Sequence, residues 1–346
     1  MFKDEQNLII QKSDDDSGSV ISFGILSENI YQSEINEYVK NQYILYPQIF
    51  VFDNKSKNYI SSISTRFVFN TKITSQSMKD NAGRIFDAYR SMILDSKIKH
   101  TFKGRCVNNE VKVSFLEIYE ILWDCLDIRS VDRFNLKIRN IDFGDSDYAK
   151  FSFLKNKNSN EAAKYKLANI ATAATSHLTF TDQFLVLPHS KEQSVATVQN
   201  RFAKTSNINV SLPEPDFVID IKIKGTKSKV LKEDEDEANL MYAIGINYKI
   251  LEPYSGTLIF DGDFKHFKPI KKPKSLKTNK INHSEQNDFF FYNLLFEELI
   301  SQISKNILRE KLDKNNKEWI GFHSNNKDEL KKILKLHDNI KKTFFK

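Results

Sequence analysis

The sequence predicts an α+β protein whose second half contains a mixed β-sheet with packed helices. Three features of the 346-residue chain indicate this class. Strand-type and helix-type segments in the second half follow the order β-α-β-α-β-β-β-α. Within 239–252, large apolar residues occupy every second position from Tyr242 to Ile250, a period typical of a half-buried antiparallel strand. The segment 286–311 instead carries apolar residues at helical spacing.

The first half predicts a separate α+β region. Residues 1–18 are polar and acidic, as expected of a flexible tail. Residues 19–130 are expected to form an α+β domain of unknown type. Its expected elements are strands at 20–26, 43–53 and 58–73, helices at 27–42 and 77–94, and an apolar segment at 111–125.

The second half predicts a domain over residues 131–312. It begins with a strand at 134–143 and an alanine-rich helix at 160–178, whose small side chains would let it lie close to a sheet. A short apolar strand follows at 182–188. A second helix is then expected to open at Ser190, because Gln193 completes a capping box. The apolar face of that helix would be Val195, Val198 and Phe202.

Three strands and a helix complete this domain. PDFVIDIKIKG (215–225) predicts a strand, and 239–252 with 256–264 predict a hairpin that turns around Pro253. The long helix at 286–311 follows. Crossover helices imply parallel neighbours early in the order, and hairpins imply antiparallel neighbours later, so the sheet is expected to be mixed. Residues 313–346 predict a C-terminal basic amphipathic helix.

This order resembles the periplasmic domain shared by the curli secretion-channel lipoprotein, the lipoprotein activators of penicillin-binding proteins and the TolB amino-terminal domain. PDFVIDIKIKG (215–225) stands where that group has an "ADYVI" strand. YKILEPYSGTLIFDGDF (248–264) stands where it has a long hairpin, with Ser255–Gly256 replacing the usual Thr–Gly. The resemblance covers residues 134–311 and implies a non-catalytic scaffold or activator that works through protein contacts. The first half has no counterpart in that group.

Asp220 and Lys222 also spell the D-x-K of metal-dependent PD-(D/E)xK nucleases, and alternation places both on one strand face. Asp216 is four residues back, about 13 Å away, too far to share a metal ion. A partner acid would have to be Asp142, Asp182 or Asp261. The favoured interpretation is an ordinary sheet strand, with its isoleucines facing the core and Asp220 and Lys222 facing solvent or a neighbouring strand.

A lysine-rich loop is expected at 265–280, with seven lysines and no acid. It could bind phosphates of nucleic acid or an anionic membrane, but a solvated loop is the favoured interpretation. The lysines of this loop could also form ion pairs with the acidic stretch 232–237, which carries the opposite charge. Its lysines are Lys265, Lys268, Lys271, Lys272, Lys274, Lys277 and Lys280.

The expected helix at 327–346 combines basic residues with an apolar stripe. This stripe could contact a membrane or a partner groove, or it could dock on the protein's own core. The stripe contains Leu330, Ile333, Leu334, Ile340, Phe344 and Phe345.

Composition and motifs point away from catalysis. The net charge of +7 permits attraction to nucleic acid or anionic membrane without implying either. No metal, phosphate-loop or nucleophile motif is present, so no cofactor and no metal are expected. No apolar run reaches the ~20 residues of a transmembrane segment. The chain as written is expected to be cytoplasmic, or periplasmic or outer-membrane-associated if a signal peptide was removed.

The function that these observations favour is a non-catalytic structural or adaptor subunit of a bacterial envelope or secretion-type assembly. Its expected partners are other protein subunits, with further copies of itself among the candidates. Two alternatives remain open. One is a Mg²⁺-dependent nuclease that uses Asp220 and Lys222, and the other is a secreted effector or nucleic-acid-binding protein that uses the lysine-rich segment.

Overall fold

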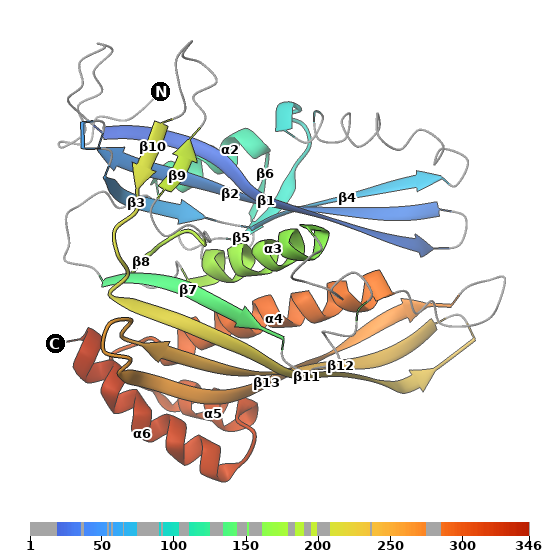
Figure 1. Cartoon of the computed structure of the whole chain (residues 1–346). Helices are drawn as coiled ribbons and strands as arrows, with labels where there is room; N and C mark the ends of the chain where they lie inside the picture. The colour runs from blue at the N-terminus through green and yellow to red at the C-terminus, as the bar shows by residue number, and fades with distance from the viewer. Residues whose placement is uncertain are drawn as a thin grey trace.

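A computed structural model defines the architecture of the chain (Figure 1). The structure describes residues 19–345, except for several short stretches. Those stretches are 36–37, 54, 57, 65, 75–89, 91–92, 104–110, 125–133, 144–150, 152–160, 179–183, 190–194, 199–207, 236 and 275–284. The expected tail at 1–18 and most of the expected helix at 77–94 lie outside the described residues.

The first half forms an antiparallel sheet in which β1 and β2 are the long strands. The strands run in the order β1-β2-β4-β5-β6, and β3 pairs with β2. Their bounds are β1 Ser19–Ile35, β2 Tyr38–Asp53, β3 Tyr59–Ser64, β4 Arg66–Thr74, β5 His100–Lys103 and β6 Val111–Val113. Helix α2 (Phe115–Asp124) follows, and its Phe115 and Ile118 join the apolar core of this sheet.

The helix expected at 27–42 is wrong. Residues 27–35 belong to β1 and 38–42 to β2, and the two strands pair from Ser19 opposite Asp53 to Ile35 opposite Tyr38. Tertiary pairing with a long neighbouring strand outweighs the local helical spacing of apolar residues in this segment.

The second half forms a five-stranded mixed sheet in the order β13-β12-β11-β7-β8. Strand β7 pairs in parallel with β8 and β11, whereas β11, β12 and β13 are successively antiparallel. The α+β class with a mixed sheet is therefore confirmed. The strand bounds are β7 Phe134–Asp142, β8 Phe184–Val186, β11 Phe217–Glu233, β12 Glu237–Leu251 and β13 Leu258–Pro273.

The alternation expected in β12 is confirmed residue by residue. Every second side chain from Ala238 to Ile250 is buried, and those between are half-buried. The turn to β13 contains Gly256, whose φ of 68° is left-handed and favours glycine. The hairpin places Tyr242 and Tyr248 on the face that packs against the helices.

The second crossover helix expected from the capping box is wrong where the structure describes it. Val195–Val198 form strand β9, which pairs antiparallel with β10 (Ile208–Ser211). Ser190, Gln193 and Phe202 lie outside the described residues. The periodicity of a short apolar run is compatible with a helix and with a strand. Here, pairing with β10 makes Val195–Val198 a strand.

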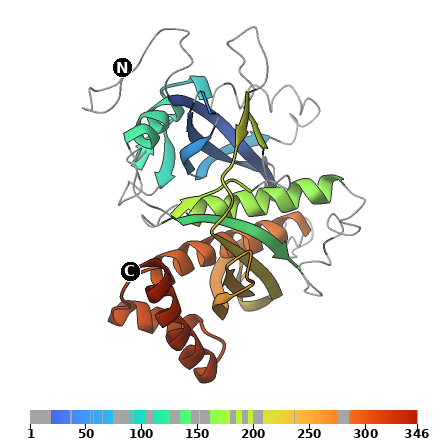
Figure 2. The same cartoon turned by 60° about the vertical axis from the view of Figure 1, so that its left-hand side comes forward.

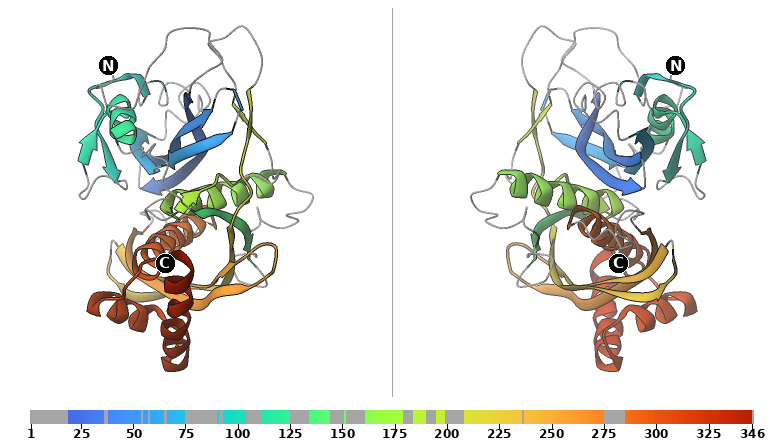
Figure 3. Two further views of the ribbon diagram at one scale, coloured as in Figure 1. Left: turned by 90° about the vertical axis from the view of Figure 1, so that its left-hand side faces the viewer. Right: turned by 90° about the vertical axis from the view of Figure 1, so that its right-hand side faces the viewer.

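Two helices lie between the sheets, as Figures 2 and 3 show from two directions. They are α3 (Glu161–Leu178) and α4 (Glu285–Ile307). Helix α4 places Phe296, Leu299 and Ile303 in the core of the second sheet. Helices α5 (Lys314–His323) and α6 (Lys327–Phe344) lie beside β13, at the end of the molecule away from the first sheet (Figure 1).

A buried carboxylate on α4 connects the two halves. Glu297 is 6% exposed and accepts a hydrogen bond of 2.7 Å from the Tyr46 hydroxyl of β2. Arg66 Nε lies 3.0 Å and His177 Nε2 3.4 Å from its other oxygen. Burial raises the pKa of Glu297, but the charge of Arg66 and the hydrogen bond with His177 outweigh it and hold the pKa below its ordinary value.

We expect Glu297→Gln to lower the free energy of unfolding by about 3 kcal/mol, because it removes the buried negative charge that faces Arg66 and His177. Denaturant unfolding at neutral pH measures this change. The control is Glu318→Gln on α5, whose exposed ion pair with Lys314 is worth less than about 1 kcal/mol. Equal losses in the two variants would contradict the role of Glu297.

Candidate functional site

The D-x-K strand is an ordinary half-buried strand in its geometry. Ile219, Ile221 and Ile223 are buried, and Asp220 lies between them on the opposite face. Asp220 accepts two hydrogen bonds from the Arg139 guanidinium, one of them 3.0 Å from Nε. The carboxylate of Asp220 is therefore engaged in a bidentate surface ion pair.

Strand register places no acid directly opposite Asp220 among the described residues. It lies opposite Asn140 on β7 and Lys249 on β12. Asp261 pairs with Lys249 and so lies one strand further away. Asp142 is in register with Lys222, while Asp182 lies outside the described residues. In the described ranges, no group of three or more His, Cys, Asp or Glu side chains is placed to hold a metal ion.

The lysine-rich segment is a strand rather than a loop as far as Pro273. Strand β12 is long, and β13 matches its length, with Glu237 opposite Pro273. Lys271 and Lys274 form ion pairs with Glu237 and Glu233 of the acidic stretch, at 2.7 and 2.9 Å. The opposite charges of these two segments therefore meet within the chain.

Two further lysines of β13 bind acids of α4. Lys268 lies 2.6 Å from Glu298, and the buried Lys272 lies 2.7 Å from Asp288. Four of the candidate lysines thus neutralise carboxylates of the same molecule. Lys265 is half-buried, and Lys277 and Lys280 lie outside the described residues.

The apolar stripe of the C-terminal helix faces the protein's own core. Ile333, Ile340 and Phe344 are buried, and the Phe344 ring contacts those of Phe134, Phe184 and Phe217. The remaining members of the stripe are partly buried against the same core, namely Leu330, Leu334 and Phe345. Of the two alternatives for α6, the structure contains the one in which it docks on its own domain.

Helices α5 and α6 cover part of the outer edge of β13. An edge strand carries unpaired backbone groups that can recruit other chains. The Asp263 backbone N–H donates to Glu329 at 2.9 Å, and the Lys265 carbonyl lies 2.7 Å from His323 Nδ1. Phe264 also forms an isolated bridge with Ser324, which follows α5. Side chains and the turn between the helices thus occupy this edge.

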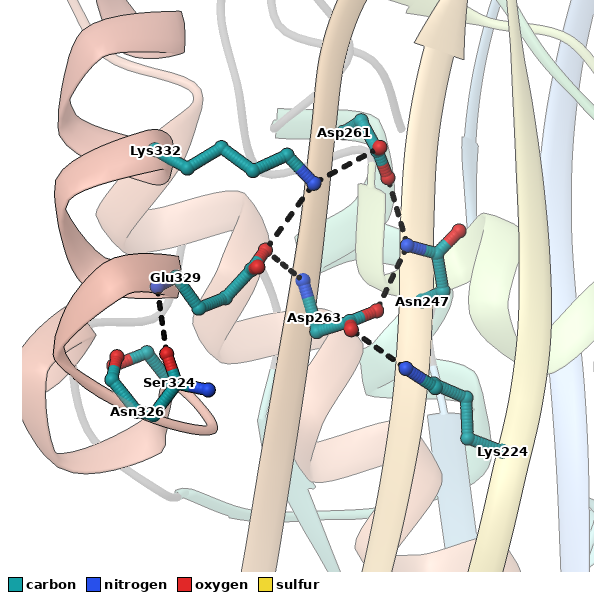
Figure 4. A network of polar contacts seen from close by, with 8 residues as sticks. All are labelled: Lys224, Asn247, Asp261, Asp263, Ser324, Asn326, Glu329 and Lys332. Atoms are coloured by element: carbon teal, nitrogen blue, oxygen red, sulfur yellow. Dashed lines mark hydrogen bonds and ion pairs between the residues drawn. The ribbon is translucent and has the colours of Figure 1, made fainter.

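Figure 4 shows the polar network that holds α6 on the strands. Lys332 reaches Asp261 at 3.0 Å, and Lys224 of β11 reaches Asp263 at 2.6 Å. The side-chain amide of Asn247 donates to both aspartates, at 2.7 and 2.9 Å. Burial raises the pKa of Asp261, but the hydrogen bonds from Asn247 and Lys332 outweigh it and lower the pKa overall.

An aromatic and histidine cluster lies at the other end of this junction. The Trp319 ring stacks on His323 with centroids 4.5 Å apart, and the Phe264 centroid is 6.0 Å from Trp319. His266 lies 5.2 Å from His323 between ring centroids and 3.2 Å from Glu298. Burial lowers the pKa of His323, and the charge of His266 lowers it further, although the Lys265 carbonyl opposes both.

The cluster reaches the surface at two phenylalanines. Phe322 of α5 is 60% exposed and Phe267 of β13 is 36% exposed, with ring centroids 5.2 Å apart. Neither was recognised from the sequence, and the histidines beside them show no motif spacing. The β13 and α5 residues are far apart in the chain, so only a prediction that α5 docks beside β13 could have found them.

Comparisons with known proteins give no family. No protein-family model matches the chain, and no curated protein matches its sequence. The hypothetical protein CT253 from Chlamydia trachomatis is 12% identical, over 50% of this chain and 96% of that one, with a TM-score of 0.23. A minor lipoprotein from Acinetobacter baumannii is 9% identical, over 51% and 94%, with a TM-score of 0.24.

A putative neuraminyllactose-binding hemagglutinin homolog from Helicobacter pylori is 15% identical, over 54% of this chain and 84% of that one, with a TM-score of 0.26. Scores this low carry no argument about function. Among the described helices, none has the length and apolarity needed to cross a membrane.

We expect thermal stability to decrease as pH falls below 6.5, the ordinary pKa of histidine. Burial lowers the pKa values of His323 and His337 in the folded state, so the unfolded chain binds protons first. The stabilisation is complete above 6.5 and is lost as pH falls toward the folded pKa values. Melting curves at pH 7.5 and 5.0 should differ by at least about 2 °C.

The variant His323→Gln keeps an N–H donor toward Lys265 but cannot gain a proton. Its melting temperature should change less between the two pH values than that of the wild type. A dependence on pH identical to that of the wild type would show that His323 does not contribute.

We expect Asp220→Asn to change the free energy of unfolding by less than about 1 kcal/mol, because the pair with Arg139 is half-exposed. Incubation with plasmid and Mg²⁺ tests the nuclease alternative directly. Nicking that requires Mg²⁺ and disappears in Asp220→Asn would establish that alternative instead.

Proposed function

We propose that the protein is a non-catalytic structural or adaptor subunit of a bacterial envelope or secretion-type assembly and that it acts through protein–protein contacts. The observation that carries this proposal is the exposed pair of rings, Phe267 and Phe322, at the junction of α5 and β13. Aromatic side chains supply a large part of the binding energy at many protein interfaces.

The envelope assignment is supported by the resemblance in strand pattern over residues 134–311 and by the element order there, apart from the second helix, in whose place Val195–Val198 form β9. We propose that residues 131–312 form the domain of the curli-channel and TolB type, and that 19–130 form a second α+β domain. Helix α5, which carries Phe322, follows directly after residues 131–312.

The backbone beside the rings makes an added strand an unfavourable mode of binding. Beyond Lys265, alternation turns the backbone groups of Phe267, Pro269 and Lys271 toward the free edge. Pro269 has no N–H to donate, and Pro273 ends the strand. A partner is therefore expected to contact the two rings rather than to extend the sheet.

The charged residues around this surface support a binding role. Lys268 and His266 share Glu298, and Lys271 is paired with Glu237. These pairs hold β13 to α4 and β12, so they stabilise the scaffold beneath the rings. A rigid scaffold lowers the entropy cost of binding a partner.

Photo-crosslinking in the native cell tests the proposal. A crosslinking amino acid at position 322 should form a discrete adduct with a partner protein, and a crosslinker at Lys314 on the same helix should not. Lys314 is a suitable control because its side chain is 87% exposed. Identical, diffuse adducts from both positions would contradict the proposal.

We expect Phe322→Ser to abolish that complex while changing the free energy of unfolding by less than about 1 kcal/mol, because the side chain is largely exposed. The matched control is Leu116→Ser on α2, which removes another exposed apolar side chain (57% exposed) and should leave the complex intact. Light scattering after size-exclusion chromatography would show whether the partner is a second copy of the chain.

A further inference from the structure

The outward face of α6 carries a row of lysines with an arrangement unlike that of β13. Lys327, Lys331, Lys335 and Lys342 are all exposed, and their spacing places them on one side of the helix. None of the four forms an ion pair with another residue in the described ranges. In contrast, each of five lysines of the second sheet meets a carboxylate within the chain, namely Lys224 of β11, Lys268, Lys271 and Lys272 of β13, and Lys274 directly after β13.

The charge of this face is positive even after its acids are included. Asp328 and Asp338 also lie on the exposed side, and Lys341 flanks it. Five lysines against two aspartates leave a net charge of +3. Lysines four residues apart on one helix repel each other and destabilise it. Repulsion within the row therefore opposes helix formation. Burial of the apolar face with Ile333 and Ile340 must offset this repulsion.

The position of α6 makes this row accessible. The apolar side of the helix is docked on the core, and the helix lies at the end of the molecule away from the first sheet (Figure 3). From Lys327 to Lys342 the row extends for about 22 Å along the helix axis. It is therefore a straight, rigid line of positive charge that faces solvent.

We propose that this lysine row of α6 binds the surface of an anionic lipid bilayer. Lysine ammonium groups act as point charges, which suits the diffuse negative charge of a membrane surface. The helix contains no arginine, whose planar fork would favour bidentate binding of phosphates in nucleic acid. Phe344 is buried and Phe345, directly after the helix, is partly buried, so neither ring is available beside the lysine row to stack on bases.

This surface uses residues distinct from Phe267 and Phe322. The binding of a membrane and the binding of a protein partner can therefore succeed or fail separately. Together they would describe an adaptor that is held at a membrane by α6 and contacts another protein through α5 and β13.

Vesicle co-sedimentation with the full chain tests the inference. The protein should pellet with phosphatidylcholine vesicles that contain phosphatidylglycerol, less so as salt increases, and not with phosphatidylcholine alone. Each Lys→Gln change in the row should lower the partition coefficient about fivefold. The combined variant K327Q/K331Q/K335Q/K342Q should lose binding by more than about a hundredfold.

A matched variant separates the row from overall charge. K222Q/K227Q/K229Q/K249Q removes the same number of lysines from the second sheet and should retain most of the binding. Circular dichroism melting checks that both variants fold. If the combined variant does not fold, the single variants K331Q and K335Q still test the inference, because each should lower the partition coefficient about fivefold.

Three outcomes would overturn the inference. The first is that the wild type does not pellet with anionic vesicles at low salt. The second is that both combined variants lose binding equally. The third is that duplex DNA or RNA competes for the row and binds it more tightly than the vesicles do, which would make nucleic acid the partner.

Discussion

Helix α4 is the element on which both sheets depend. It contributes Phe296, Leu299 and Ile303 to the core of the second sheet, and it presents Glu297 to the first. A carboxylate in this position is stable only because Tyr46, Arg66 and His177 surround it. These partners come from β2, β4 and α3, so one side chain ties together four elements. Burying a charge without a partner costs several kcal/mol. A packing of the two sheets that moved one of these partners away would leave the charge of Glu297 uncompensated, so the carboxylate favours this one arrangement.

The second constraint is the outer edge of β13. Its backbone is covered by α5 and α6 where Asp263 and Lys265 face outward, and prolines interrupt the donors further along. Covering an edge in this way limits uncontrolled strand pairing. It also creates the surface on which the proposed functions rest, because docking of α5 exposes Phe322 beside Phe267 and docking of α6 turns its lysines outward.

Periodicity predicted the elements that are long and bury one side. The alternation of β12 and the helical spacing of α4 both correspond to buried faces in the structure. Periodicity failed where a segment was short or where a neighbouring strand decided its conformation. Residues 27–35 and 38–42 form strands because β1 and β2 pair along their whole length, and Val195–Val198 form β9 by pairing with β10. The expected loop after Phe264 became strand because β12 offers a partner as far as Glu237.

The sequence by itself determined the class of the fold, the apolar faces of its longest elements and the opposite charges of two segments around the β12 strand. Each of these is a local property of residue spacing or composition. Only the tertiary structure decided that Asp220 meets Arg139, that His323 reaches the Lys265 carbonyl 58 residues away, and that the apolar stripe of α6 is buried. Such contacts depend on strand register and helix docking, which are set by the free energy of the whole core rather than by any one segment.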